Sequence, residues 1–300
     1  MSFGEVTGRR RFLRGAAAAL GAAAVSPARA APGLPTPGQF RVDVDDLRVF
    51  CELRGAGAPT ILLNCMWQDS FTDHFGAPLL AALAGHRRVL TFDQRGQGRT
   101  TLGKGRVTYG RFAHDTVRLM DRLNIGQAHF IGHSDGGVVQ LELLRDYPER
   151  VASATLLGTS FSQDSYRPSV RAMFTQWFEQ MRSGADVVET PHQLEKRARY
   201  ERVSPEPQNF HAMLVAQRDC WATQPNFSLR ELALIRRPVL VFSAGRDESM
   251  PPAQFDLLAA SIPGAKRIAM PDMTHDIRPH IPQIVAAFVG FTNTLPPVAL

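Results

Sequence analysis

The stretch Phe130-Ile131-Gly132-His133-Ser134-Asp135-Gly136-Gly137 decides the fold of this chain. It continues an apolar run that starts at Ala128, and it predicts a short strand that turns sharply into a helix beginning near Gly136. The glycines that flank Ser134 remove side chains that would collide with the strand and the helix. The serine would lie at a helix N-terminus, where backbone N–H groups favour negative charge. An ordinary glycine-rich turn has the same pattern, so the interpretation depends on the rest of the chain.

Strand-like and helix-like segments alternate on both sides of this stretch. The expected strands span 40–44, 48–54, 60–64, 88–92, 128–131, 151–157, 238–242 and 265–270, and the expected helices span 75–84, 109–123, 138–147, 252–261 and 281–294. The first two strands form an antiparallel pair around Asp45-Asp46. Apolar strands that alternate with helices predict an α/β fold with a mostly parallel sheet covered on both faces.

Residues 160–235 break this alternation. They contain helical patterns, such as the spacing of Val170, Met173, Trp177 and Met181, and no convincing strand. We therefore expect a helical cap at 160–235, inserted into a core formed by residues 31–159 and 236–300.

Residues 1–30 have the pattern of a twin-arginine signal peptide. Arg9-Arg10-Arg11 precedes an apolar stretch at 15–25, and Ala28-Arg29-Ala30 follows as a cleavage site. The apolar stretch is too short for a membrane span, so no stable membrane insertion is expected after its removal. The sequence predicts cleavage after Ala30 and a periplasmic or secreted protein. The alternative is a disordered basic tail.

Charge limits the possible partners. The chain has 34 Lys and Arg and 28 Asp and Glu, and its net charge is +6. Five of the basic residues and one acidic residue lie within 1–30, which leaves 29 basic and 27 acidic residues and a net charge of +2. Without a basic cluster, a nucleic-acid partner is not expected, and a small-molecule substrate is.

The three cysteines do not have the spacing of a metal site. Cys51, Cys65 and Cys220 cannot all pair with one another, and buried free thiols are favoured over a disulfide, which an oxidising compartment would permit. Neither the cysteines nor the histidines cluster as zinc ligands do, so no metal is expected.

A serine hydroxyl becomes a nucleophile when a base removes its proton and a third group orients that base. The sequence supplies both partners after later strands: Asp247 follows 238–242, and His275 follows 265–270. The order Ser134, Asp247, His275 is the one that accompanies a Gly-x-Ser-x-Gly elbow of this kind. We therefore expect Ser134 as the nucleophile, His275 as the base and Asp247 as its orienting acid.

The acid and the base of this triad each have rivals. Glu248 competes with Asp247, while His133 and His280 compete with His275. Asp135 is expected to interact with the helix N-terminus, or to shape the pocket, rather than to do chemistry.

On these motifs, residues 39–295 resemble the α/β-hydrolase superfamily. Asp93-Gln94-Arg95-Gly96-Gln97-Gly98 is similar to a structural turn of many members. Members often carry Glu five residues and Pro seven residues after the histidine, and here those places hold His280 and Pro282. The resemblance implies a cofactor-free serine hydrolase that works through an acyl-enzyme.

The segment after the strand 60–64 departs from the commonest family pattern. Most members have His-Gly here, whereas this chain has Asn64-Cys65-Met66-Trp67-Gln68. By position, the resemblance implies that the N–H groups of Met66 and Asp135 form the oxyanion site. Enol-lactone hydrolases of the superfamily can carry a similar segment, which favours a lactone or a small ester as substrate.

Aromatic side chains would line the space between core and cap, or simply pack the cap. They are Trp67, Phe71, Phe161, Trp177 and Trp221. Together they predict an apolar pocket. The expected function is therefore an exported serine hydrolase that cleaves a small, mostly apolar ester or lactone. Alternatives on the same triad are carbon–carbon bond hydrolysis and cofactor-free peroxidase or perhydrolase chemistry, and an alternative of another class is a catalytically weak small-molecule-binding protein.

Overall fold

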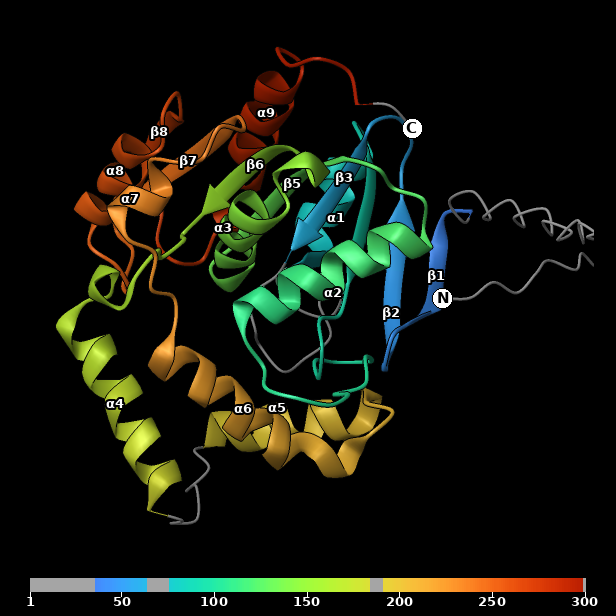
Figure 1. Cartoon of the computed structure of the whole chain (residues 1–300), viewed down its shortest axis with the longest axis vertical. Helices are drawn as coiled ribbons and strands as arrows, with labels where there is room; N and C mark the ends of the chain where they lie inside the picture. Colours follow the sequence, from blue (N-terminus) through green and yellow to red (C-terminus); the bar gives the residue numbers. More distant parts are fainter. Residues whose placement is uncertain (1–35, 64–75, 184–190, 299–300) are drawn as a thin grey trace, which may run out of the picture. The chain divides into compact units, whose positions relative to one another are not determined.

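The computed structural model describes residues 36–63, 76–183 and 191–298. Within them, eight strands form one sheet in the order β1-β2-β4-β3-β5-β6-β7-β8 (Figure 1). The strands are β1 (Gly38–Val44), β2 (Leu47–Arg54), β3 (Pro59–Leu63), β4 (Arg88–Phe92), β5 (Ala128–His133), β6 (Val151–Leu157), β7 (Val239–Ala244) and β8 (Lys266–Met270). β2 pairs antiparallel with β1 and with β4, and the other neighbours are parallel. The predicted mostly parallel sheet is confirmed.

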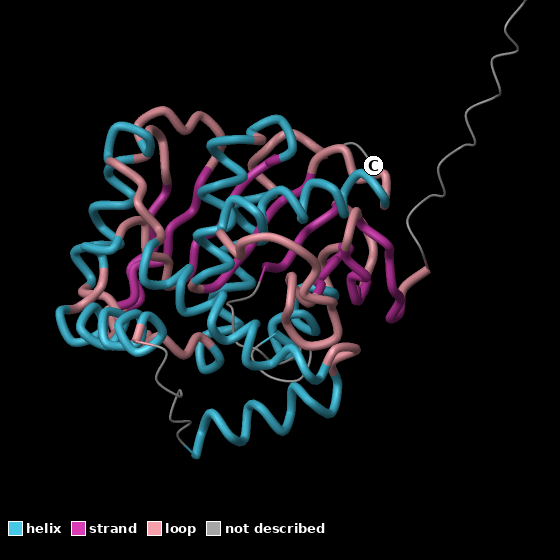
Figure 2. Tube along the Cα trace, turned by 60° about the horizontal axis from the view of Figure 1, so that its bottom comes forward, coloured by secondary structure: helices cyan, strands magenta, loops and turns pink. Residues whose placement is uncertain are grey.

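Helices cover this sheet on both faces, as Figures 1 and 2 show. The helices of the alternating pattern are α1 (Gly76–Ala84), α2 (Tyr109–Arg122), α3 (Asp135–Asp146), α8 (Pro252–Ser261) and α9 (Ile281–Thr292). α2 packs against α3, α1 packs against α9, and α8 contacts β7. The central strands β3 and β5 are buried along their whole length, which explains why their sequences are apolar rather than alternating.

The sequence of α2 illustrates how each covering helix is specified. The Thr108 side chain accepts from the Arg111 N–H and so satisfies one of the N–H groups left over at the helix start. Apolar residues such as Phe112 and Met120 face the core, whereas Arg118 lies on the solvent side and pairs with Asp45.

Between β6 and β7 the chain forms α4 (Pro168–Arg182), α5 (Pro191–Val203), α6 (Phe210–Thr223) and the short α7 (Leu229–Leu232). These helices lie in the segment 160–235 that the sequence assigns to a cap, and the division of the chain into domains stays a prediction. Hydrogen bonds tie the segment to the rest of the fold: Glu206 accepts from the Leu102 N–H at 2.7 Å, and Gln224 accepts from the Tyr109 N–H at 3.1 Å.

The buried face of α4 differs from the face expected from the sequence. Among the side chains of α4 whose burial is described, Phe174 is the buried one, while Met173 is 37% exposed. Phe174 lies directly beside the expected stripe, four positions after Val170 and three before Trp177. Its ring contacts the rings of Tyr166, Trp177 and Trp221.

The turn that resembles Asp-x-Arg-Gly-x-Gly has a structural role. The Arg95 guanidinium is fully buried and binds both carboxylate oxygens of Asp115 on α2, at 2.8 and 2.9 Å. Asp46 in the turn between β1 and β2 accepts from it as well. A buried arginine with several acceptors fixes the edge of the sheet to α2.

Residues 1–30 lie outside the described part of the chain, so the signal peptide and its cleavage after Ala30 stay predictions. None of the helices described by the structure combines the length and the apolar character that crossing a membrane requires.

Candidate active site

The three residues of the predicted triad follow three strands of the parallel run β5-β6-β7-β8. Ser134 directly follows β5, Asp247 follows β7, and His275 follows β8. Because the carboxyl ends of parallel strands meet at one edge of a sheet, residues far apart in sequence converge there.

The backbone of Ser134 is strained into a conformation that few residues other than glycine adopt. Its φ is +53° and its ψ is −118°. Two glycines allow this turn to pack: a Cβ at Gly132 would come within 2.7 Å of the Gly136 backbone, and a Cβ at Gly137 would come within 1.8 Å of Thr159 Oγ1. The Ser134 N–H donates to the carbonyl of Leu157 on β6 at 2.8 Å, which fixes the turn to the next strand.

A chain of hydrogen bonds joins the three side chains. His275 Nε2 lies 3.1 Å from Ser134 Oγ, and His275 Nδ1 lies 2.8 Å from Asp247 Oδ2. A carboxylate oxygen only accepts, so the neutral imidazole carries its proton on Nδ1. Nε2 is then the atom that accepts the serine proton, as a general base requires.

Asp247 is held as an anion inside the protein. Its side chain is fully buried, and Oδ1 accepts from the N–H groups of Ser249 and Met250 at 2.8 and 2.9 Å. Burial by itself raises the pKa of Asp247, but the hydrogen bonds from His275, Met250 and Ser249 outweigh it and lower that pKa below its ordinary 3.8.

The same pair sets the basicity of His275. Burial lowers the pKa of the imidazole, but the hydrogen bond and the charge of Asp247, supported by the charges of Asp135 and Glu248, raise the pKa above its ordinary 6.5. The His275 side chain is 27% exposed, so a substrate can reach it.

The alternative candidates for the acid and the base, Glu248, His280 and His133, make other contacts. Glu248 accepts from the His275 backbone N–H at 2.9 Å, whereas the hydrogen bond to the His275 imidazole is that of Asp247. His280 is the N-cap of α9. His133 Nε2 lies 2.8 Å from the carbonyl oxygen of His275. The sequence places His133 beside the nucleophile, but nothing in the sequence signals its contact with the base.

Asp135 is the first residue of α3, and its carboxylate is buried. Its Oδ1 accepts from the Tyr109 hydroxyl, and from Trp221 Nε1 at 3.1 Å. The expected interaction with the helix N-terminus is thus accompanied by a contact with α6. The first N–H groups of a helix have no acceptor within it, which suits the Asp135 N–H to the predicted oxyanion role. The second predicted donor, Met66, lies outside the described residues.

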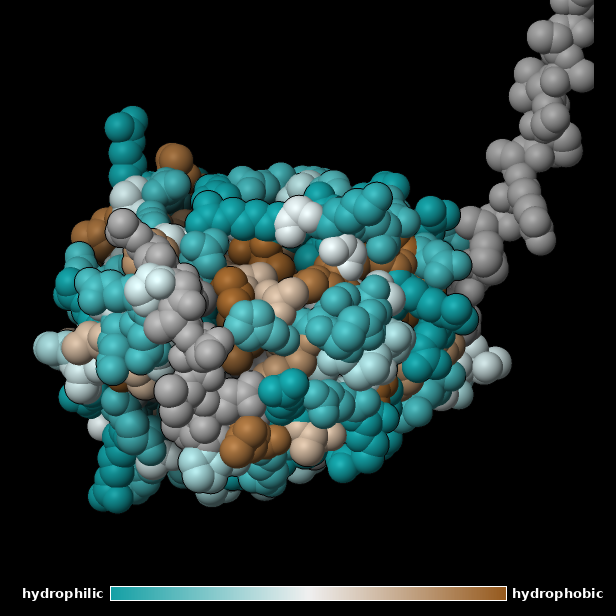
Figure 3. All heavy atoms as spheres, turned by 90° about the horizontal axis from the view of Figure 1, so that it is seen from below, coloured by the Kyte–Doolittle hydropathy of each residue, from teal (hydrophilic) through white to brown (hydrophobic). Residues whose placement is uncertain are grey.

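Aromatic rings gather beside Asp135. Trp221 lies 5.9 Å from both Trp177 and Phe174, measured between ring centroids, and Tyr166 meets Phe174 edge-on at 5.1 Å. Phe174 and Tyr166 are members that the sequence analysis missed, because only their contacts distinguish them from other aromatic residues of this segment. The four rings are called the aromatic cluster below. Seen from the side of α4 to α6, the surface has apolar residues at its centre and hydrophilic ones around them (Figure 3).

The other expected pocket residues have different outcomes. Phe161 is buried in the main core, and its carbonyl accepts from the Phe227 N–H at 2.8 Å. Trp67 and Phe71 lie outside the described residues, as does Cys65.

Cys51 and Cys220 are free and buried. Burial raises the pKa of both thiols far above the ordinary value. Among the residues with described positions, no three or more His, Cys, Asp or Glu side chains are arranged to hold a metal ion.

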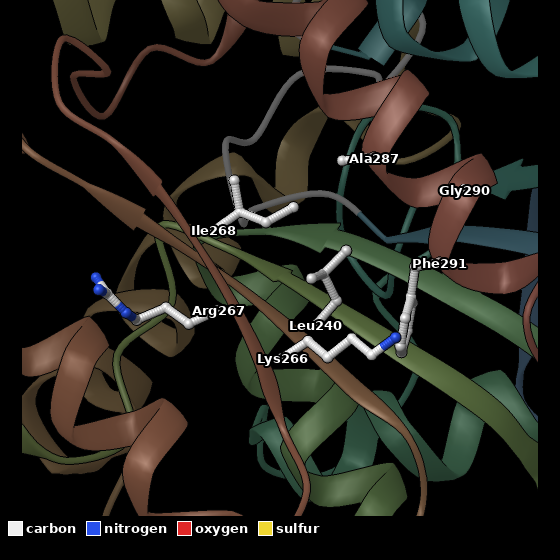
Figure 4. Close-up of a pocket in the computed structure, with 7 residues that line it drawn as sticks. All are labelled: Leu240, Lys266, Arg267, Ile268, Ala287, Gly290 and Phe291. Carbon is white, nitrogen blue, oxygen red and sulfur yellow. The ribbon is translucent and has the colours of Figure 1, made fainter.

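A pocket of about 450 Å³ lies between the sheet and α9 (Figure 4). It is lined by Leu240, Lys266, Arg267, Ile268, Ala287, Gly290 and Phe291. These residues belong to the starting halves of β7 and β8 and to α9, whereas the triad follows the ends of the strands. In Figure 4 the Arg267 side chain points away from Leu240 and Phe291. The pocket is therefore separate from the triad.

The chain was compared with known proteins. Residues 64–277, a range that includes all three triad residues, match the family model described as "alpha/beta hydrolase fold". Over 113 residues the chain is 33% identical to a protein of Azorhizobium caulinodans provisionally named carbamate hydrolase RutD, with 38% of this chain and 42% of the relative covered. It is 27% identical over 259 residues to the dihydrolipoyllysine-residue acetyltransferase component of an acetoin cleaving system from Pseudomonas putida, with 81% of this chain and 65% of the relative covered. The chain thus spans less than two thirds of the length of these curated relatives.

Solved structures show the same fold. A hydrolase from Pseudomonas aeruginosa PA01 superimposes with a TM-score of 0.65 at 27% identity, covering 84% of this chain and 98% of that one. The enol-lactonase from Burkholderia xenovorans LB400 gives a TM-score of 0.66 at 24% identity, covering 85% and 100%. The family model, the sheet order and the elbow agree, and the chain belongs to the alpha/beta hydrolase fold family.

Proposed function

We propose that this α/β-hydrolase is a serine hydrolase that cleaves a small, mostly apolar carboxylic ester or lactone through an acyl-enzyme. The observation that carries the proposal is the position of His275, whose ring lies within hydrogen-bonding distance of Ser134 on one side and Asp247 on the other. A structural histidine would not need a strained serine as its partner.

In the first half of the reaction, His275 Nε2 takes the proton of Ser134 as its Oγ attacks the substrate carbonyl carbon. The Asp247 carboxylate stabilises the imidazolium that forms and keeps its ring in position. The carbonyl oxygen becomes an oxyanion, to which the Asp135 N–H donates. His275 then gives the proton to the leaving alkoxide, and the acyl group remains on Ser134.

In the second half, a water molecule replaces the leaving group. His275 takes a proton from this water as it attacks the acyl carbon, and then returns the proton to Ser134 Oγ as the acid is released. For a lactone, the alcohol and the acid belong to the same product molecule. No step requires a redox change.

The aromatic cluster supports an apolar acyl or alcohol group. Trp221 contacts Asp135, the residue that follows the nucleophile, so the rings stand beside the reacting carbonyl. A second candidate, hydrolysis of a carbamate, is favoured by the likeness to the relative provisionally named carbamate hydrolase. The same attack on a carbonyl would serve both substrates, and a panel of esters, lactones and carbamates distinguishes them.

A fluorophosphonate probe should label Ser134 stoichiometrically, because the activated hydroxyl attacks phosphorus as it attacks a carbonyl. Peptide mapping by mass spectrometry locates the label. His275→Ala should lower the labelling rate by at least about 10³-fold, whereas the matched variant His280→Ala should leave it within about threefold. A folded, unlabelled wild-type protein would refute the proposal.

The pH dependence of kcat/KM should reflect the raised pKa of His275. The base must be neutral, so kcat/KM should fall as the pH drops through a midpoint above 6.5. In Asp247→Asn, burial still lowers the pKa of His275, but the negative charge of Asp247 that raised this pKa is gone. The midpoint should therefore move to lower pH, and kcat should fall about 10⁴-fold.

Glu248→Gln is the matched control for Asp247→Asn. Its amide oxygen can still accept from the His275 N–H, so kcat should fall less than about tenfold. If Glu248→Gln lowers kcat about 10⁴-fold while Asp247→Asn has little effect, Glu248 rather than Asp247 is the acid of the triad.

The aromatic cluster should set the preference for acyl length. Trp221→Ala should lower the ratio of kcat/KM for a hexanoyl ester to that for an acetyl ester by about tenfold, because the longer chain loses apolar contact. Trp221→Phe keeps the ring but loses the N–H that Asp135 accepts, so this ratio should stay close to that of the wild type. An unchanged preference in Trp221→Ala would place the acyl group elsewhere.

A further inference from the structure

His133 directly precedes the nucleophile in sequence and packs against the ring of the base, and the reaction steps above give it no role. It is the last residue of β5, directly before Ser134, and only 4% of its surface is exposed. Its ring centroid lies 4.7 Å from that of His275, with the ring planes inclined by 46°. A buried polar ring packed against the base requires an explanation, because burying such a group is costly unless it forms hydrogen bonds.

The His133 ring contacts the backbone of the base. Its Nε2 lies 2.8 Å from the carbonyl oxygen of His275. A carbonyl oxygen only accepts, so His133 carries a proton on Nε2 and donates it. Burial, together with the nearby positive charge of a protonated His275, lowers the pKa of His133 to about 3. The ring therefore stays neutral at every pH at which the base can work.

Other hydrogen bonds tie the segment around His275 to the loop after β7. The His275 N–H donates to Glu248 at 2.9 Å, and the Arg246 N–H donates to the Met273 carbonyl at 2.9 Å. Both partners belong to the loop that carries the acid of the triad. The hydrogen bond from His133 instead joins the segment around His275 to β5, the strand that precedes Ser134.

We propose that His133 is a positioning residue: its hydrogen bond to the His275 backbone fixes the imidazole relative to the Ser134 hydroxyl. β5 and β8 are not neighbours, since β6 and β7 lie between them, so the sheet alone links nucleophile and base through two intervening strands. The bond from His133 joins the two ends directly. A displacement of about 1 Å between reacting groups can cost about 10²-fold in rate, so this short link matters for catalysis.

Substitution of His133 removes the N–H group that donates to the His275 carbonyl and so tests the proposal. His133→Leu should lower kcat for p-nitrophenyl acetate about 10- to 100-fold with little change in KM, and should lower the rate of fluorophosphonate labelling of Ser134 by the same factor. His133→Gln should recover part of both rates, because its amide N–H can donate to the same carbonyl.

His129→Gln is the matched control. His129 lies on the same strand and the same side, is 3% exposed, and has a hydrogen bond of 2.9 Å between its Nδ1 and Ser153. Its replacement should lower the melting temperature without changing the labelling rate of the folded protein. The proposal is overturned if folded His133→Leu labels at the wild-type rate, or if His129→Gln slows labelling as much as His133→Leu does.

The inference rests on the proposed function, and a second measurement separates the two. Nitrogen-15 NMR of the histidines in the wild-type protein should show His133 neutral and protonated on Nε2 from about pH 5 to about pH 9. A proton on Nδ1, or a titrating ring, would overturn the positioning contact even in an active enzyme. A wild-type protein that fluorophosphonate does not label would refute the proposed function, while this tautomer would still decide the contact.

Discussion

The strained backbone of Ser134 is the constraint on which the rest of the site depends. A positive φ at a residue with a side chain is costly, so it persists only where the surroundings hold it. Here the holding groups are the close packing at Gly132 and Gly137 and the hydrogen bond to Leu157 on the next strand. The turn brings the Ser134 hydroxyl within 3.1 Å of His275 Nε2, and α3 begins at the next residue, Asp135.

The charges and hydrogen bonds around this turn raise the pKa of His275 and lower the pKa of Asp247. Asp247 is buried, but two backbone N–H groups and the His275 ring stabilise its negative charge. That charge in turn raises the pKa of His275. The charge of Asp135 also raises the pKa of His275, and its carboxylate accepts a hydrogen bond from Trp221. Asp135 therefore connects the electrostatics of the site with the aromatic cluster.

Much of the fold could be predicted from the sequence, because its strands are apolar and its helices are amphipathic. β6 and α8 have the expected bounds, and β4 does as well. The triad could be proposed from chain order alone, since strand ends must meet at one edge of a parallel sheet. The structure places Ser134 and His275 within hydrogen-bonding distance, and their catalytic role stays a prediction.

Other features depend on contacts that no local pattern contains. Met173 and Phe174 are adjacent apolar residues of α4, and the periodicity favoured Met173, which is exposed, while Phe174 is buried. His133 was a rival for the base by residue type only, and its bond to the His275 carbonyl depends on how the end of β5 and the loop after β8 approach each other. The same holds for the contact between Asp135 and Trp221, which are separated by more than eighty residues.

The most direct test of the central claim is rapid-quench mass spectrometry during turnover of p-nitrophenyl acetate. The account predicts an acetyl group on the peptide that contains Ser134, formed in the burst and lost as turnover ends. Steady turnover without a covalent species, or an acetyl group on another residue, would contradict it.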